Sequence, residues 1–115
     1  MANRTDQPAP QPSPVDVALH VLLNQPSYAA QMLITTARLL EMEPGHPLTG
    51  LDLERAIDIA ADTILRPLPD VVAEDSISRM YRALPDRPTS VTRGEYAPHL
   101  RLAAIALDTV RGEQR

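Results

Sequence analysis

Apolar side chains recur at helical spacing through most of the chain, and they are densest in residues 27–42. Between Ser27 and Leu40 the only formal charge is Arg38. Apolar residues fall on nearly every side of a helix drawn through this stretch, and Gln31, Thr35 and Arg38 form its one polar line. A helix that is apolar around most of its girth is covered by neighbours on more than one side. The pattern therefore predicts the central helix of a small soluble bundle.

A helix is also predicted upstream, over residues 13–24. Ser13 is suited to the N-cap, Pro14 to the first helical position and Asp16 to the first turn. Pro26 separates this helix from the central one, so the two are expected to form a tight hairpin. The predicted buried face consists of Val15, Ala18, Leu19 and Leu22.

Two more helices are predicted after the proline-rich stretch that ends the central helix. Thr49 and Asp52 have capping-box spacing and open a helix that reaches about residue 66, before Pro67. Asp70 caps the next helix, which extends to about residue 84. The predicted inward residues are Leu53, Ala56, Ile57, Ala60 and Ile64 on the first of these helices, and Ala73, Ile77, Met80, Tyr81 and Leu84 on the second.

The last helix has two predicted starts. Thr92 and Glu95 have capping spacing, but a proline inside a helix removes a hydrogen bond and crowds the preceding turn. We therefore favour a helix that begins at Pro98 over one that begins at Thr92 and bends. The run LAAIAL over residues 102–107 is apolar without a break, and we expect it to pack against the central helix. Leu33 and Ala104 are the predicted core residues.

These elements predict an all-α, compact, five-helix bundle-like domain over residues 13–115. Hydrophobic residues make up 43% of the 115-residue chain, enough for one core. Residues 1–12 carry three prolines and almost nothing apolar, so we expect a disordered tail there. The chain has no cysteine, which excludes disulfides and thiolate metal sites. We expect a cytoplasmic protein, because no signal-peptide or membrane-spanning pattern is present.

Acidic residues on the third predicted helix raise the possibility of a metal site. Glu54, Asp58 and Asp62 stand at steps of four, and Mg²⁺ prefers clustered oxygen ligands. Helical nucleotide pyrophosphohydrolases hold Mg²⁺ with carboxylates on facing helices, but their paired-acid pattern is absent here. A solvated helix face is the favoured interpretation. The histidines, His20, His46 and His99, have no zinc-helix spacing, and we predict neither a cofactor nor an enzyme.

Four arginines form the candidate binding feature, which we call the arginine strip: Arg79, Arg82, Arg87 and Arg93. Tyr81 and Tyr96 are interleaved with them, a composition that suits phosphate contacts. The net charge of −4 argues against a dominant nucleic-acid role. Arg79 and Arg82 can instead pair with Asp75, Ser78 or Asp86 nearby.

The sequence therefore favours a non-enzymatic interaction or regulatory protein that works through a helical surface and forms a homodimer. Two helices are apolar nearly all round, and uncovered apolar surface is typical of an interface. One alternative is a nucleic-acid-associated protein that uses the arginine strip. A second alternative is a metal-dependent nucleotide phosphohydrolase that uses Glu54, Asp58 and Asp62.

Overall fold

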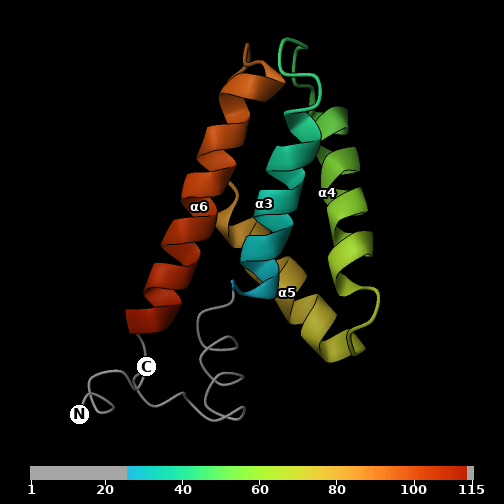
Figure 1. The fold of residues 1–115 in the computed structure, drawn as a ribbon, viewed down its shortest axis with the longest axis vertical. Helices are drawn as coiled ribbons and strands as arrows, with labels where there is room; N and C mark the ends of the chain where they lie inside the picture. Colours follow the sequence, from blue (N-terminus) through green and yellow to red (C-terminus); the bar gives the residue numbers. More distant parts are fainter. Residues whose placement is uncertain (1–25, 114–115) are drawn as a thin grey trace, which may run out of the picture.

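The computed structural model describes residues 26–113, which form four α-helices and no strand (Figure 1). This confirms the predicted all-α class. The predicted helix over residues 13–24 and the predicted tail over residues 1–12 lie outside the described residues. The four helices are α3 (Tyr28–Leu40), α4 (Gly50–Leu65), α5 (Asp70–Ala83) and α6 (Arg93–Glu113).

Helix α3 occupies the central position that its sequence predicts. It packs against α4, α5 and α6, with α6 and α4 on either side of it and α5 crossing behind (Figure 1). Leu33 is fully buried, as expected, while Arg38 is exposed on the outward polar line. The other buried residues of α3 are Ala29, Ala30, Met32, Thr36, Ala37 and Leu40.

Helix α4 begins with the predicted capping box. Thr49 Oγ1 accepts a hydrogen bond from the Asp52 N–H at 3.1 Å, and Asp52 Oδ2 accepts one from the Thr49 N–H at 3.4 Å. The hydrogen bond to Thr49 holds the pKa of Asp52 below its usual value. Four of the five predicted inward residues are buried, and Leu65 is buried in place of the half-buried Ile64.

Helix α5 and the residue after it turn four of the five predicted inward residues toward the core, since Met80 is buried and Ala73, Ile77 and Leu84 are half-buried against it. The buried residues of α5 are Ser76 and Met80, one turn apart. Tyr81 was predicted to face inward but is 47% exposed, so that prediction is wrong. The reason is geometric, because Tyr81 lies about 100° around the helix from Met80 and α5 packs mainly on α3.

Helix α6 begins at Arg93, and Pro98 lies inside it, so the favoured start at Pro98 is wrong. Thr92 and Glu95 form a reciprocal pair, with the Thr92 N–H donating to Glu95 Oε1 at 2.9 Å and the Glu95 N–H donating to Thr92 Oγ1 at 3.1 Å. Pro98 lies in the second turn, where its missing N–H costs the one hydrogen bond to the Gly94 carbonyl. The capping pair therefore decides where the helix starts. The helix also continues through Gly112 to Glu113, although glycine is a residue type that often ends helices.

The run LAAIAL is less buried than its composition suggests. Ala104 is 3% exposed and belongs to the core, as predicted, but Leu102 and Ile105 are 62% and 64% exposed. The N-terminal half of α6 supplies most of its core residues instead, namely Tyr96, Ala97 and Leu100. Helix α6 therefore packs on α3 along one face and leaves an apolar outer face.

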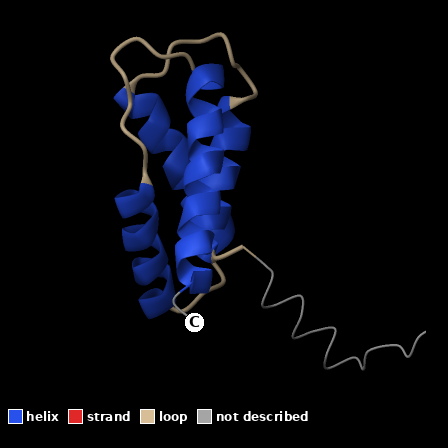
Figure 2. Ribbon diagram, turned by 90° about the vertical axis from the view of Figure 1, so that its left-hand side faces the viewer, coloured by secondary structure: helices blue, strands red, loops and turns tan. Residues whose placement is uncertain are grey.

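The α3–α4 connection (residues 41–49) and the α5–α6 connection (residues 84–92) meet at one end of the bundle (Figure 2). Pro47 and Thr92 form an isolated antiparallel bridge, which is flanked by two backbone hydrogen bonds of 2.9 Å, one from the Leu48 N–H to the Val91 carbonyl and one from the Arg93 N–H to the His46 carbonyl. These bonds fix the start of α4 beside the start of α6.

Candidate functional site

The structure places the arginine strip in two separate settings. Arg79 and Arg82 lie on α5, where their polar contacts among the described residues are to their own helix. Arg79 Nε is 2.8 Å from Asp75 Oδ2, and Arg82 Nε donates to the Ser78 carbonyl at 3.4 Å. These are among the partners expected from the sequence.

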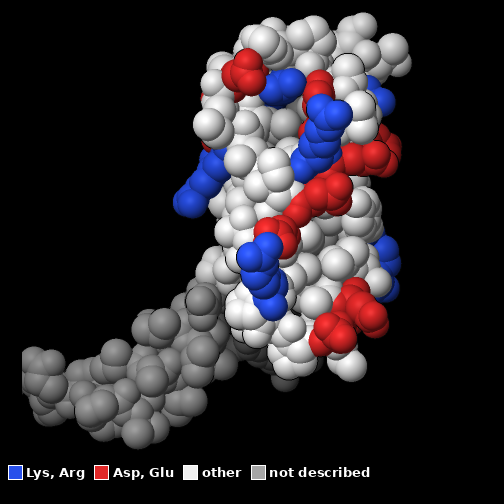
Figure 3. Space-filling view, turned by 90° about the vertical axis from the view of Figure 1, so that its right-hand side faces the viewer, with Lys and Arg blue, Asp and Glu red and all other residues white. Residues whose placement is uncertain are grey.

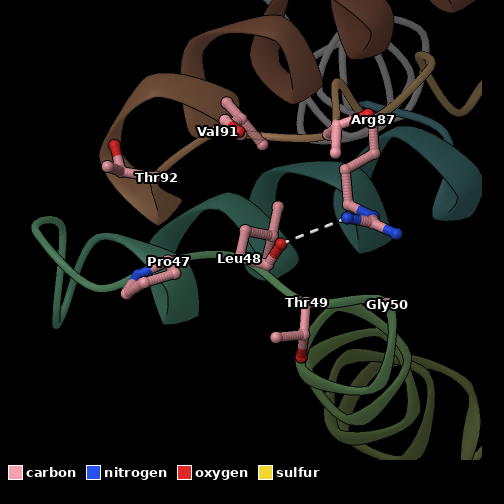
Figure 4. A pocket seen from close by; sticks show the side chains of 9 residues that line it. Pro47, Leu48, Thr49, Gly50, Arg87, Val91 and Thr92 are labelled. Carbon is pink, nitrogen blue, oxygen red and sulfur yellow. Dashed lines mark hydrogen bonds between the residues drawn. The ribbon is translucent and has the colours of Figure 1, made fainter.

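Arg87 and Arg93 lie instead at the meeting point of the two connections. Arg93 Nη1 is 3.3 Å from Glu43 Oε1, and its Nη2 is 3.3 Å from Asp52 Oδ2. Arg87 Nη1 donates to the Leu48 carbonyl at 3.2 Å (Figure 4). These partners are distant in sequence, so local spacing gave no signal for them.

The aromatic side chains of the arginine strip are not both available for stacking. Tyr96 is fully buried, and its hydroxyl donates to the Pro85 carbonyl. Burial raises the pKa of Tyr96. Tyr96 is therefore a core residue that holds α6 to the connection before it. The prediction that grouped Tyr96 with the arginine strip missed this role. Tyr81 alone remains half exposed.

A hollow of about 530 Å³, the loop pocket, lies beside Arg87 (Figure 4). It is bordered by both helix N-caps, Thr49 and Thr92. The N–H groups at these helix starts are engaged by Asp52 and Glu95, whose negative charges oppose an incoming anion. The lining residues are Pro47, Leu48, Thr49, Gly50, Arg87, Thr89, Ser90, Val91 and Thr92. This lining contains no carboxylate, imidazole or thiol that could act in general acid–base chemistry.

The acidic residues of α4 lie on an exposed face. Figure 3 shows acidic and basic side chains interleaved on the side of the molecule that carries α4. Asp62 is paired with Arg66 through Oδ1 and Oδ2, both 2.9 Å from Nη2. Burial is the main cause of the raised pKa of Tyr81 on α5, and the negative charges of Asp58 and Glu54 add to it.

Within residues 26–113, no three histidine or acidic side chains converge in a way that could hold a metal ion. His46 is exposed, with its Nε2 3.3 Å from Glu43 Oε2, and His99 is exposed on α6. His20 lies outside the described part of the chain. None of the described helices is long and apolar enough to cross a membrane.

The side of α6 that faces away from α3 exposes two large apolar residues, Leu102 and Ile105. Leu102 and Ile105 stand three positions apart, and the other exposed residues of α6 between Pro98 and Thr109 are Pro98, His99, Ala106 and Thr109. Glu95, which is also exposed, lies one turn before Pro98. We call the six exposed residues from Pro98 to Thr109 the outer α6 face. It carries no carboxylate, lysine or arginine, because Arg101 points toward Glu41 and Asp108 toward Ser27.

A groove separates this face from α3. This α3–α6 groove has a volume of about 350 Å³, and its lining is mostly apolar: Pro26, Ala30, Ile34, Ala104, Ile105, Asp108 and Thr109. A second hollow of about 320 Å³ lies on the other side of Ile34 and shares Pro26 with the groove. One side of α3 is therefore flanked by helices but not covered by any described residue.

Comparisons of the chain with protein-family models, with curated proteins and with solved structures gave no match.

Proposed function

We propose that the protein is a non-enzymatic interaction or regulatory protein of the cytoplasm that forms a homodimer through the outer α6 face. In this proposal the domain has five helices, the fifth being the predicted helix over residues 13–24. The observation that carries the proposal is the exposure of Leu102 and Ile105 on a helix face without formal charge.

Physical chemistry favours pairing of this face with its own copy. Two α6 helices related by a two-fold axis bring the same patch together from both sides. Burying a leucine or isoleucine side chain fully contributes about 1.5–3 kcal/mol, and the pair has no like charges to bring together. Small residues such as Ala106 allow the two backbones to approach closely.

The two alternatives have less support. Arg79 and Arg93 are already paired with carboxylates, and Tyr96 is buried, so little of the arginine strip is left for phosphate. The acids on α4 lie on one solvated face without a facing set of ligands among the described residues.

Light scattering behind a sizing column tests the dimer. The full chain has a mass of 12.6 kDa, and we expect about twice that mass at micromolar concentration. Leu102→Glu places a charge at the centre of the outer α6 face and should give a folded monomer. Leu51→Glu is the matched control, because Leu51 is 56% exposed on α4, away from that face, and this variant should stay dimeric.

A wild-type chain that stays monomeric up to about 100 μM, where even a Kd near 1 μM would give a dimer, overturns the proposal. A Leu102→Glu variant that remains dimeric overturns the assignment to the outer α6 face. Circular dichroism on each variant verifies that the helices are intact.

A further inference from the structure

The α3–α6 groove has the apolar lining expected of a helix-binding surface. Its floor is formed by Ala30 and Ile34 of α3, and its wall by Ala104 and Ile105 of α6. The small alanines let a third helix backbone come close, while the two isoleucines supply apolar contact. An amphipathic helix laid along such a groove buries its apolar face against both flanking helices.

The chain enters the described part of the structure at this groove. Pro26, the first described residue, lines it, and Gln31 Nε2 donates to the Pro26 carbonyl at 2.9 Å. The next residue, Ser27, is held to α6, because its N–H and Oγ both donate to the carboxylate of Asp108, at 3.2 Å and 2.7 Å. Pro26 therefore borders both the α3–α6 groove and the second hollow, and the bonds from Ser27 to Asp108 hold this end of α3 against α6.

The preceding segment is long enough to cover the groove, whose lining on the α3 side runs from Pro26 to Ile34. Residues 13–24 would span about 18 Å as a helix, at 1.5 Å per residue. The stretch from Ser27 to Arg38 has the same number of residues and covers about 18 Å by the same rise. With only Gln25 and Pro26 between the two, the segment can turn back along α3 over the whole length of the groove.

The segment also matches the groove in its apolar pattern, and one of its acids comes level with a basic residue beside the groove. In an antiparallel arrangement, the rise per residue brings Leu22 level with Ala30, and Ala18 and Leu19 level with Ile34. Asp16 then comes level with the end of α3 that carries Arg38, which lines the second hollow on the other side of Ile34 and has no carboxylate within ion-pair distance among the described residues. An acid near this cation is favourable in either exposed or half-buried surroundings.

We infer that residues 13–24 form a helix that lies antiparallel to α3 in the α3–α6 groove and covers Ile34 and Ala104. This inference rests on the fifth helix of the proposed function, but not on the dimer. A tethered segment has an effective concentration near millimolar, so it outcompetes a second copy at micromolar concentration for the same groove. Ile105 and Thr109 border both surfaces, whereas the other four residues of the outer α6 face, Leu102 among them, do not line the groove and remain open.

The absence of cysteine allows a clean cross-linking test in the full chain. Ile34→Cys is combined with a second cysteine at Ala18 or Leu19, which the register places toward the groove. The matched controls combine Ile34→Cys with Val17→Cys or His20→Cys, which lie at the same height but on the opposite face of the same helix. Mild oxidation is followed on non-reducing gels, and intrachain bridges are identified by mass spectrometry.

We expect the Ala18 and Leu19 pairs to form intrachain disulfides at least about tenfold faster than the Val17 and His20 pairs, since only the former hold the thiols together in the bound geometry. Equal rates at all four positions would show a tethered segment without a fixed face and would overturn the inference. Bridges between chains would overturn it in favour of an exchanged segment.

The same samples separate this inference from the proposed dimer. Repeating the oxidation in the Leu102→Glu background should leave the ratio of rates unchanged, because Leu102 does not line the groove. A monomeric chain with the expected ratio removes the dimer and retains the packed segment. A dimer with equal rates retains the proposed dimer and removes the packed segment.

Discussion

Arg101 of α6 donates two hydrogen bonds to Glu41, the residue that follows α3. Nη2 donates to Oε1 at 2.6 Å, and Nε donates to Oε2 at 3.2 Å. The two residues are 60 positions apart in the chain. Together with the bonds from Ser27 to Asp108, this pair fixes α6 to both ends of α3. The hydrogen bonds to Arg101 lower the pKa of Glu41 and raise that of Arg101.

The pH dependence of folding should follow from this pair. The folded state lowers the pKa of Glu41 from its ordinary value of 4.5. The ionised Glu41 therefore contributes fully to the free energy of unfolding above pH 4.5, and this contribution is lost as the pH falls through the pKa of the folded state. Partly exposed pairs contribute about 0.2–1 kcal/mol. In urea titrations, Glu41→Gln should lower the wild-type midpoint at pH 7 and leave the two proteins closer together near pH 3. A constant difference across this range would show that the pair does not titrate with folding.

Gly94 should not accept a side chain. A Cβ built there lies 2.8 Å from Pro44 Cβ and 3.1 Å from the Pro44 carbonyl oxygen, while the Gly94 N–H donates to that same carbonyl at 2.9 Å. Gly94→Ala should therefore lower the free energy of unfolding by about 1–3 kcal/mol, as overpacking does. The control is Gly45→Ala, where nothing lies within 4 Å and the change should stay within about 0.5 kcal/mol. Chemical denaturation compares the two, and equal stabilities would contradict the close packing of these connections.

Ala104 should tolerate no charge. It is 3% exposed and faces α3, so Ala104→Arg leaves a cation unpaired in the core at a cost of about 3 kcal/mol or more. Ile59→Arg introduces the same charge at a position of α4 that is 54% exposed, and it should unfold near the wild-type temperature. If thermal melts show equal effects of the two variants, Ala104 is not a core residue.

The acids of α4 should behave as a solvated face. Asp58→Asn relieves repulsion at steps of four and should be neutral or slightly stabilising, by a few tenths of a kcal/mol. Mg²⁺ or Mn²⁺ should leave the melting temperature unchanged, because an ion stabilises only a state that binds it. A metal-dependent rise that Asp58→Asn abolishes would revive the phosphohydrolase alternative.

The same variant has a spectroscopic readout in Tyr81. Burial is the main cause of the raised pKa of Tyr81, and the charges of Asp58 and Glu54 add to it. Removing the charge of Asp58 should therefore lower that pKa in an ultraviolet titration. Asp62→Asn is the control, because Asp62 is bound to Arg66 and does not act on Tyr81.

Local sequence signals predicted much of the fold. The apolar girth of α3 identified the central helix, and the Thr49–Asp52 spacing located the start of α4, because both depend on neighbours in the chain. Pro98 misled the prediction of α6, since its cost was judged to outweigh the cap at Thr92, whereas the helix starts at that cap. Periodicity also overestimated the burial of residues 102–107, because it counts apolar side chains but not the neighbours available to cover them.

The candidate sites were less predictable than the fold. The spacing of Arg79 identified its partner on the same helix, but Arg87 and Arg93 find theirs in a connection some 40 to 50 positions away. Such pairings depend on how the helices are arranged in space. The α3–α6 groove has the same origin, since neither Ile34 nor Ala104 alone indicates that they share it.

The bridge between Pro47 and Thr92 has a consequence for the order of folding. The bridge joins two connections that are distant in the sequence: Glu43 and Arg93, which pair across the same connections, are 50 positions apart. A long loop must therefore close before the bridge can form. The pairing of α3 with α4 needs a much shorter closure and is kinetically favoured. We therefore expect α3 and α4 to associate early, and the end of the bundle that holds both connections to lock last and to open first.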